Sequence, residues 1–412
     1  MEFIADFHIH SKYSRATSKD MDITHIAEWA KLKGITLMGT GDFTHHLWLE
    51  GLKANLEDLG NGLFKYKDIY FILTTEISSI YSKKGRTYRI HNIIFAPSFN
   101  TVDKINDTLS RWGNLASDGR PILGLDAAEL ARIIFDIDED CVIVPSHAWT
   151  PWFSVFGSMS GFDKIEDCFE NQTPKIFAIE TGLSSDPAMN WRLSALDKFT
   201  LISNSDSHSP SKIGREANVF DCELDFNTIR EALKTKDKKR FLYTVEFFPE
   251  EGKYHFDGHR LCQVRLSPKQ TRDNKGRCPK CGKSVTVGVL NRVEQLADRP
   301  EGFVPNSAIP YKNLVPLDEI IAEAKGLGKE SVAVQRDYRS FIAKFGTEFD
   351  ILLRRTSEDL FQGLPRRVAE GVLKVREGKV HIQPGFDGEY GKISIFSEEE
   401  RQDKAEQQLK LF

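Results

Sequence analysis

Short apolar runs alternate with amphipathic stretches over the first two hundred residues. Stretches with helical periodicity, such as ITHIAEWAKLKG and LDAAELARIIFDI, separate several of these runs. Seven runs are rich in β-branched and aromatic residues and read as strands: EFIADF, ITLMGT, IYFILTTE, HNIIFAP, CVIVPS, KIFAIE and FTLISNS. Repeated strand and helix predict an α/β fold with a parallel sheet, and about seven strands suit a closed or nearly closed barrel. An open doubly wound sheet is the alternative.

The pattern changes after about residue 245. Gly, charged residues and clustered cysteines occupy residues 251–290, and four helical stretches follow between 316 and 377. The segment after residue 380 returns to short strand and turn signals. We therefore expect four parts: a barrel over 1–245, a small module over 246–300, a mainly helical domain over 301–400 and a flexible tail over 401–412.

Charge changes this picture at one place. The chain of 412 residues has a formal net charge of -4, yet residues 260–299 carry ten Lys and Arg against three acidic residues. A segment this basic inside an acidic protein indicates a surface that faces a polyanion, although a solvated loop is the alternative. No apolar run is long enough to span a membrane, and MEFIADFHIH lacks the order of a signal peptide, so we expect a cytoplasmic protein.

Residues that bind metal ions follow nearly all of the predicted strands. His8 and His10 follow the first strand, and because side chains alternate along a strand, both point to the same side. Asp206 and His208 repeat this spacing after the seventh strand. Asp42 and His45, Glu76, His147 and Glu180 stand at the ends of four further runs, and His91 opens the remaining one.

These residue types predict a metal centre with several ions. The C-terminal ends of parallel barrel strands meet at one rim, where active sites form. Imidazoles and carboxylates collected there suit two or three adjacent divalent cations, which Glu76 or Asp206 could bridge. A single histidine is explained equally well as a core or surface residue, but a set at this many strand ends is not. Histidines suit zinc and carboxylates suit manganese or magnesium, so the identity of the ions stays open.

Four of these segments resemble the motifs of PHP-type phosphoesterases: DFHIHS, the pair TTEIS and RIHNIIF, PSHAW, and SNSDSHS. The resemblance implies a distorted seven-stranded barrel, a polynuclear metal centre and hydrolysis of a phosphoester. By motif, the metal ligands would be His8, His10, Asp42, Glu76, His91, His147, Asp206 and His208.

The chain departs from the PHP pattern at two places. Many members have a further histidine shortly after the first pair, where this chain has Tyr13 and Ser14. The usual Asp-His pair after the second strand reads Asp42-Phe43. Whether His45 or Glu180 joins the metal site, and whether a third metal site is complete, therefore stays open.

Asp206 is the residue that we expect to act in catalysis, because it could bridge the metals and orient the attacking water. Lys12, Arg15 and Arg192 could neutralise phosphate charge, although a solvated surface position explains each of them as well.

Three cysteines and a histidine have the spacing of a structural zinc site. Cys262 stands three residues after His259, and Cys278 and Cys281 form a CPKCG knuckle whose glycine permits a tight turn. The fourth ligand is His259 or, as the substitute, His255. The basic residues surround this site, so we expect a zinc ribbon that faces a phosphate backbone.

The segment after His147 is unusually aromatic. It places Trp149, Trp152, Phe153 and Phe156 among Gly and Ser residues, with neither helical nor strand periodicity. Such a loop beside a metal rim would suit stacking of an unpaired base. A small core that closes one end of the barrel is the alternative.

Together these features resemble the endonuclease Q family of repair nucleases, through the PHP motifs, the aromatic insertion, the HxxC…CPxCG ribbon, GVLNRVEQLADRP and PGFDGEYGKI. The resemblance covers nearly the whole chain. It implies cleavage of DNA on the 5′ side of uracil, hypoxanthine, xanthine or an abasic site, with 301–400 contacting DNA. A PHP phosphatase of a small phosphorylated metabolite is the alternative, and it leaves the ribbon and the basic segment unexplained. A DNA-binding module without metals is less consistent with the full ligand set.

The chain ends in QQLKLF, and exposed Leu and Phe gain nothing from water. Gln408, Leu409, Leu411 and Phe412 resemble the QLxLF peptide that binds the bacterial sliding clamp. The resemblance implies a bacterial source and a nucleoid-associated protein. A tail that folds back on its own domain is the alternative.

Overall fold

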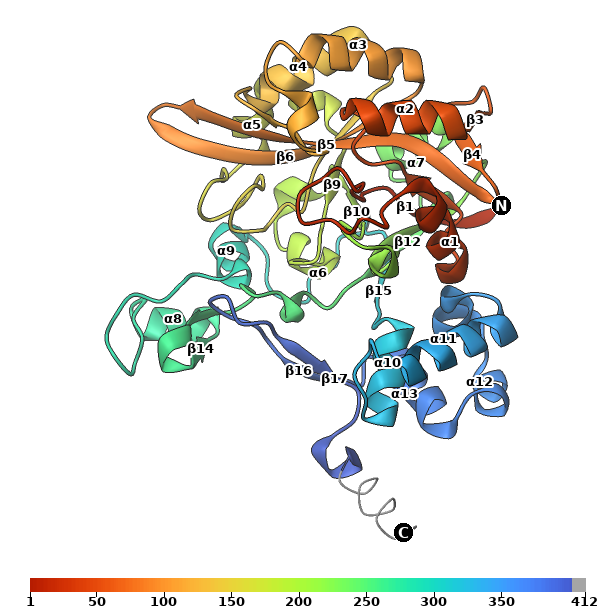
Figure 1. Cartoon of the computed structure of the whole chain (residues 1–412). Helices are drawn as coiled ribbons and strands as arrows, with labels where there is room; N and C mark the ends of the chain where they lie inside the picture. Colours follow the sequence, from red (N-terminus) through yellow and green to blue (C-terminus); the bar gives the residue numbers. More distant parts are fainter. Residues whose placement is uncertain (402–412) are drawn as a thin grey trace.

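The computed structural model describes residues 1–401, and most of the first 245 residues form an α/β barrel (Figure 1). Its main sheet connects eleven strands among the described residues. The predicted α/β class is confirmed. The strands of this sheet are β1 (Glu2–Asp6), β2 (Leu37–Gly39), β3 (Glu57–Asp58), β4 (Phe64–Tyr66), β5 (Ile69–Lys83), β6 (Arg86–Ala96), β7 (Ile122–Leu123), β8 (Val142–Pro145), β11 (Ala217–Asp221), β12 (Phe241–Glu246) and β15 (Tyr311–Asn313).

The strands of the barrel wall pack around one apolar cluster, but backbone hydrogen bonds do not join all of them into one sheet. Strands β1, β2, β5, β6 and β8 pair in that order, whereas β9 (Ala178–Glu180) and β10 (Thr200–Ile202) pair with each other. A bridge between Ile9 and Ser207 connects the segments that follow β1 and β10. One buried apolar cluster takes side chains from all seven of these strands, which is the interior that a distorted barrel requires.

Alternation along β1 explains why this strand lies in the wall. Phe3 and Ala5 belong to the interior cluster, while Ile4 belongs to the larger cluster that includes the surrounding helices. Successive side chains of a strand point to opposite faces, so an apolar run buried on both faces is expected here.

The expectation of a parallel sheet is wrong for β6, which runs antiparallel to both β5 and β8. Its cause is the two-residue turn between β5 and β6. Lys84 and Gly85 have φ angles of 50° and 77°, the left-handed conformations of a tight hairpin turn. A turn this short can join only antiparallel strands. The resulting hairpin, paired as far as Lys83 and Arg86, extends beyond the barrel (Figure 1).

Seven α-helices accompany the strands of the first 245 residues. Asp22 caps the first of them by accepting from the backbone N–H groups of Thr24 and His25. Figure 1 shows α2, α3 and α4 on the side of the barrel away from the C-terminal part. The helices are α1 (Ile23–Lys33), α2 (His46–Asn55), α3 (Phe99–Leu109), α4 (Ala127–Ile137), α5 (Ile165–Phe169), α6 (Pro187–Asn190) and α7 (Phe226–Thr235).

The cysteine-rich module that follows is small. It contains the antiparallel pair β13 (Asp257–His259) and β14 (Val264–Leu266), followed by α8 (Pro268–Asp273) and α9 (Val289–Leu296). Asp257 is buried and accepts from the backbone N–H of Gly288 and from Thr271 and Asn291. These bonds fix the module around one carboxylate, since its core contains few apolar residues.

Four α-helices lie within the described residues 316–380: α10 (Leu317–Lys325), α11 (Val332–Phe345), α12 (Ser357–Gly363) and α13 (Arg366–Arg376). They contact the barrel through a buried ion pair of 2.6 Å between Lys33 and Glu348, and Tyr338 also donates to Glu348. The hairpin of β16 (His381–Gln383) and β17 (Lys392–Ser394) follows, and Phe386 bridges Phe256 of the cysteine-rich module. The proposed boundaries near 245 and 300 stay predictions. Strand β15, which follows the second boundary, pairs with β12 of the barrel, so the chain returns to the main sheet after the cysteine-rich module.

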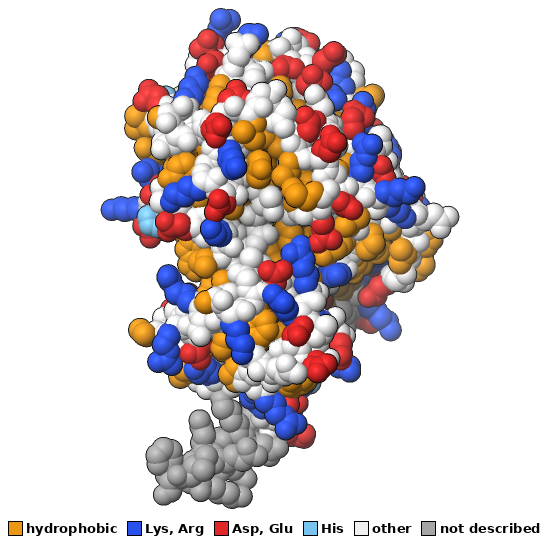
Figure 2. Space-filling view, turned by 90° about the vertical axis from the view of Figure 1, so that its right-hand side faces the viewer, with side chains coloured by type: hydrophobic (Ala, Val, Ile, Leu, Met, Phe, Trp, Pro, Cys, Tyr) orange, Lys and Arg blue, Asp and Glu red, His pale blue; other side chains and the backbone are white. Residues whose placement is uncertain are grey.

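The surface on the side of α11 and α12 mixes both signs of charge (Figure 2). It contrasts with the basic segment at residues 260–299. None of the helices within residues 1–401 combines the length and the apolar character needed to cross a membrane.

Candidate metal centre

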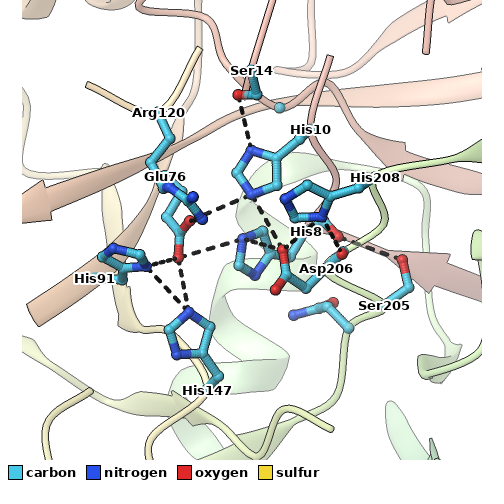
Figure 3. A network of polar contacts seen from close by, with 12 residues as sticks. His8, His10, Ser14, Glu76, His91, Arg120, His147, Ser205, Asp206 and His208 are labelled. Carbon is cyan, nitrogen blue, oxygen red and sulfur yellow. Dashed lines mark hydrogen bonds and ion pairs between the residues drawn. The ribbon is translucent and has the colours of Figure 1, made fainter. Parts of the chain in front are cut away.

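Seven of the eight predicted ligands meet at one place, although they lie up to two hundred residues apart in the chain (Figure 3). The segments after β1, β8 and β10 provide five of them. Glu76 and His91 instead lie inside β5 and β6, since these strands continue into the hairpin. The residues that meet are His8, His10, Glu76, His91, His147, Asp206 and His208.

They form three overlapping groups of potential ligands. In each group the ligand atoms lie within 4.8 Å of one another. Glu76 and His10 each belong to two groups. The two oxygens of Glu76 allow it to bridge adjacent ions, whereas His10 has one ring nitrogen left and can bind one ion only. The groups are His8, His10 and Glu76; Glu76, His91 and His147; and His10, Asp206 and His208.

The ligand atoms face one another at short range. Oε1 of Glu76 lies 3.1 Å from Nδ1 of His91 and 3.2 Å from Nε2 of His147. Oδ1 of Asp206 lies 3.2 Å from Nε2 of His10. Such distances between nitrogen and carboxylate oxygen suit atoms that share one ion at about 2.0–2.2 Å.

Buried ligand atoms without hydrogen-bond partners support this interpretation. Nε2 of both His8 and His10, Oε1 of Glu76 and Oδ1 of Asp206 have none among the described residues. A buried polar atom without a partner costs on the order of 1–3 kcal/mol, so four that converge indicate that cations satisfy them. The residues therefore fit a centre with more than one divalent metal.

Two further carboxylates orient the histidines. Glu180 lies 3.0 Å from Nδ1 of His8, and Asp42 lies 3.0 Å from Nδ1 of His10. Each directs Nε2 of its histidine toward the centre, as outer carboxylates do in metal sites. Glu180 lies outside the three groups of potential ligands, and it also accepts from the backbone N–H of His147 at 2.8 Å.

Asp42, which the sequence predicts as a metal ligand, lies outside the three groups of potential ligands. Its Oδ2 accepts from the backbone N–H of Ser11 at 2.6 Å and from the hydroxyls of Ser11 and Ser14 at 2.7 and 2.9 Å. Its Oδ1 faces His10, so both oxygens are already engaged. Asp42 therefore orients a ligand.

His45 does not join the centre either. Its ring stacks between Tyr13 at 4.5 Å and His46 at 5.1 Å, measured between ring centroids. The third group consists of His10, Asp206 and His208, and it shares His10 with the first group. Positions 13 and 14, where many PHP members have a further histidine, are Tyr and Ser.

Burial and charge set the protonation states here. Burial alone would raise the pKa of Glu76, but the imidazoles of His91 and His8 and the guanidinium of Arg120 lower this pKa well below its usual value. Burial lowers the pKa of His91 to about 4 against the opposing effect of Glu76. Glu76 is therefore ionised and His91 neutral, which are the forms of these two residues that bind metals.

Three site residues have left-handed backbones: Asp42 at a φ of 51°, His147 at 31° and Asp206 at 45°. Such conformations cost roughly 1–3 kcal/mol each and persist where the surroundings impose them. A Cβ at Gly182 would lie 2.5 Å from Cβ of His147, so only glycine fits beside this residue.

Arg120 is a site residue that sequence analysis missed. Its Nη1 lies 3.1 Å from Oε2 of Glu76. The sequence gives little indication of this role, because the SDGRP segment that contains Arg120 follows none of the seven predicted strands. Of the cations expected near phosphate, Arg192 pairs with Glu294 at 2.5 Å, Arg15 is exposed, and Lys12 lies over the ring of Tyr13.

The cysteine-rich module provides a second candidate site. His259, Cys262, Cys278 and Cys281 place one ligand atom each within 4.8 Å of the others. His255 is buried against Phe256 and outside this group, so His259 is the fourth member. Burial would raise the pKa of Cys278, but the backbone N–H groups of Cys281 and Lys280 lower it, which favours the thiolate. The set fits a structural zinc ion.

The aromatic loop divides into two pairs. Trp152 and Phe153 line a cavity of about 430 Å³ over the metal centre, and an adjoining cavity of about 1010 Å³. Trp149 and Phe156 are only 1% exposed and pack together at 4.8 Å, and Nε1 of Trp149 donates to Asn190. The expectation that Trp149 and Phe156 face a base is therefore wrong, because they form a small core under the loop.

Comparison with known proteins finds relatives over nearly the whole chain. The family model described as MJ0043 C-terminal domain matches residues 316–379. The crystal structure of a lesion-specific endonuclease from Pyrococcus furiosus is 34% identical, covers 97% of this chain and 96% of its own, and has a TM-score of 0.87.

Two further relatives add to this. A structure of endonuclease Q with a 27-mer duplex that carries an abasic lesion at the active site is 34% identical, with a TM-score of 0.85. It covers 97% of this chain and 98% of its own. The uncharacterized protein MJ0043 of Methanocaldococcus jannaschii is 36% identical over 257 residues, which are 60% of this chain but 31% of that protein. The chain thus spans less than a third of that relative.

Proposed function

The chain belongs to the endonuclease Q family, and from that premise we propose that it is a metal-dependent DNA repair endonuclease that cuts on the 5′ side of a lesion. Its substrates are abasic sites and deaminated bases such as uracil, hypoxanthine and xanthine. The observation that carries this proposal is the match to a lesion-specific endonuclease over 97% of the chain. A phosphatase of small metabolites would need the barrel alone.

The metal centre suits hydrolysis of a phosphodiester. Two or three adjacent divalent cations, whether zinc, manganese or magnesium, would activate water and neutralise charge on phosphorus. In the reaction, a water oxygen bonds to phosphorus, the bond from phosphorus to one sugar oxygen breaks, and that oxygen takes up a proton. Asp206 lines the cavity over the centre, where its carboxylate can orient the water.

The larger cavity suits a nucleotide that leaves the duplex. Trp152, Phe153 and Tyr254 provide aromatic faces, and Trp152 and Tyr254 meet edge to face at 5.7 Å. Lys212 and Lys253 line the same cavity and can donate to a carbonyl oxygen. Deamination places a carbonyl where the normal base has an amine, and a weakly paired base costs less to extrude.

The ribbon and the helical region suit the flanking duplex. Arg265, Lys269, Lys280 and Lys283 lie on the module around the candidate zinc site, where cations contact a phosphate backbone. Residues 301–400 are the second part that we assign to DNA binding. Gln408, Leu409, Leu411 and Phe412 lie outside the described residues, and docking on a sliding clamp stays a proposal.

One cleavage assay tests the proposal. End-labelled duplexes with uracil, hypoxanthine, xanthine, an abasic site or no lesion would be incubated with manganese or magnesium. We expect cutting 5′ of the lesions by the wild type and by the control Asp107→Asn, which changes an exposed carboxylate on α3. Asp206→Asn should not cut.

Two results would reject the proposal. Equal cutting of the undamaged duplex would remove lesion specificity. Rapid hydrolysis of nitrophenyl phosphate with no cutting of any duplex would favour the metabolite phosphatase.

A further inference from the structure

We propose that Arg120 is a catalytic residue that contacts the phosphate to be cut and stabilises the charge on its oxygens. The inference rests on the proposed nuclease function and adds a cationic side chain to the metal centre. Arg120 lies in a loop between the short helix Leu115–Ser117 and β7.

The sheet anchors this loop beside Glu76. Ile122 of β7 pairs with Ser78 of β5, and the backbone N–H of Ser78 donates to the carbonyl oxygen of Pro121 at 3.0 Å. Ser78 is two residues from Glu76 on the same strand, so their side chains point to the same side. The position of Arg120 therefore depends on the strand that carries the shared ligand.

Gly119 brings the loop into close contact with the first histidine segment. Its N–H donates to the carbonyl oxygen of Tyr13 at 3.1 Å. A Cβ at this position would lie 2.2 Å from Oδ2 of Asp42 and 2.4 Å from Oγ of Ser14. Only glycine fits there, so the loop is built to approach the group that orients His10.

Asp118 fixes both sides of this contact. Its Oδ1 accepts from the backbone N–H groups of Arg15 at 3.3 Å and of Arg120 at 3.1 Å. Its Oδ2 lies 3.3 Å from Nε of Arg15. One carboxylate thus connects the loop to the segment after β1 and holds the backbone of Arg120.

The guanidinium of Arg120 then reaches into the centre (Figure 3). One of its five N–H donors is directed at Oε2 of Glu76 at 3.1 Å. The side chain is 26% exposed and lines the cavity of about 430 Å³ together with His91, His147 and Asp206. Most of its donors are therefore left for a ligand in that cavity.

The chemistry of that ligand follows from the donors. A planar guanidinium bonds two oxygens of a phosphate at once, and it does so more strongly where water is largely excluded. Of the described residues that line this cavity, the Lys and Arg side chains are Arg120 and Arg15, and Arg15 is 77% exposed. Arg120 is the less exposed of the two and lies next to the metal ligands, so it is placed to meet the phosphate as charge develops on its oxygens.

A purely structural role would be to support Glu76, and the test must separate the two. We would measure single-turnover cleavage of an abasic duplex, duplex affinity and bound metal for the wild type, Arg120→Lys and Arg120→Gln. Arg132→Gln serves as the matched control, since Arg132 is half exposed on α4 and its ion pairs within residues 1–401 are with Glu129 and Asp136.

We expect Arg120→Gln to slow cleavage on the order of 100-fold, as for the loss of one preorganised donor to a transition state. Metal content should be unchanged, and duplex affinity should change little because one phosphate contact among many is lost. Arg120→Lys should recover part of the rate. Replacing one nonbridging oxygen of the scissile phosphate by sulfur should slow the wild type more than Arg120→Gln, because sulfur accepts poorly from the guanidinium.

Three outcomes would overturn the inference: cleavage by Arg120→Gln close to the wild-type rate, bound metal that falls together with the rate, or a sulfur effect equal in both proteins. The second outcome would assign Arg120 to the support of Glu76. If the wild type cuts no lesion with any divalent metal while Arg132→Gln behaves identically, the proposed function itself fails, and the inference fails with it.

Discussion

A carboxylate behind a histidine decides which ring nitrogen faces the metal centre. Asp42 and Glu180 act in this way on His10 and His8, and both lie on segments that sequence patterns associated with direct ligation. From sequence, a ligand and a residue that orients a ligand look alike, because both are acidic residues at the end of a strand. The difference depends on about 3 Å of placement, which only the folded chain determines.

Glu180→Gln should lower the affinity for divalent metal about 10- to 100-fold, the usual cost of removing an outer partner of a ligand. In the wild type, one oxygen of Glu180 accepts from Asn204 and the other from the backbone N–H of His147. The glutamine amide has an NH2 group in place of one of these oxygens, so it cannot keep both bonds while facing His8. Calorimetric titration of metal into the metal-free protein measures this. Glu57→Gln, an exposed change on β3, is the control, and an equal loss in both variants would contradict the prediction.

The buried carboxyl group of Glu246 makes the free energy of unfolding depend on pH. Burial raises the pKa of Glu246 to about 8, although hydrogen bonds from Thr244 and Thr181 lower it, and the nearby Asp186 adds to the increase. Glu246 is protonated in the folded chain at neutral pH but ionises near 4.5 when unfolded. Unfolding therefore releases a proton between these values, and stability falls as the pH rises from about 4.5 to 8.

Glu246→Gln should reduce this dependence. The difference in melting temperature, variant minus wild type, should be a few degrees larger at pH 8 than at pH 5. About 1 kcal/mol corresponds to roughly 2–4 °C in a domain of this size. Scanning calorimetry at both values measures the gap. If the difference between the two melting temperatures does not increase with pH, Glu246 is already ionised in the folded chain at neutral pH.

At the scale of elements, the strands that carry the site were predictable and their directions were not. The i, i+2 spacing of His8 and His10 and the apolar runs before them are local signals. The reversal at β6 depends on Lys84-Gly85, a two-residue turn that a strand-then-helix interpretation overlooked. The same hairpin carries β5 and β6 beyond Glu76 and His91, so both ligands lie within strands.

The exposed end of this hairpin should contact DNA. Lys84 and Arg86 have no carboxylate partner among the described residues, and Arg86 lies over the ring of Tyr88 at 5.2 Å. Lys84→Glu combined with Arg86→Glu should weaken binding of damaged and undamaged duplexes alike and reduce the salt dependence of affinity. Fluorescence anisotropy at several salt concentrations measures this. Lys104→Glu on the exposed face of α3 should bind normally, and an equal loss there would point to net charge alone.

At the scale of the whole molecule, function was predictable because several weak signals had one common explanation. A barrel with metal ligands, a cysteine knuckle in a basic segment and an aromatic loop each fit many proteins. Arg120 could not be predicted in this way, since it reaches Glu76 across 44 residues of chain through a loop that Gly119 and Asp118 shape. Burial also could not be read from the sequence of the aromatic loop: Trp149 and Phe156 are buried, whereas Trp152 and Phe153 line the cavities, and a contact with a base stays a prediction.

The chain end permits a prediction that involves the whole protein and its partner. Residues 407–412 lie outside the described residues, but their apolar side chains follow a charged stretch and match a clamp-binding peptide. Leu411→Ala combined with Phe412→Ala should leave cleavage of a short lesion duplex unchanged, because the candidate ligands and Arg120 lie within residues 8–208. Binding to a bacterial sliding clamp should fall by at least about tenfold, since each buried Leu or Phe contributes roughly 1.5–3 kcal/mol. Anisotropy of a labelled 403–412 peptide with purified clamp measures this directly. Equal binding by the wild-type and double-alanine peptides would reject the clamp, and slower cleavage by the variant without any clamp would favour a tail that folds back on its own domain.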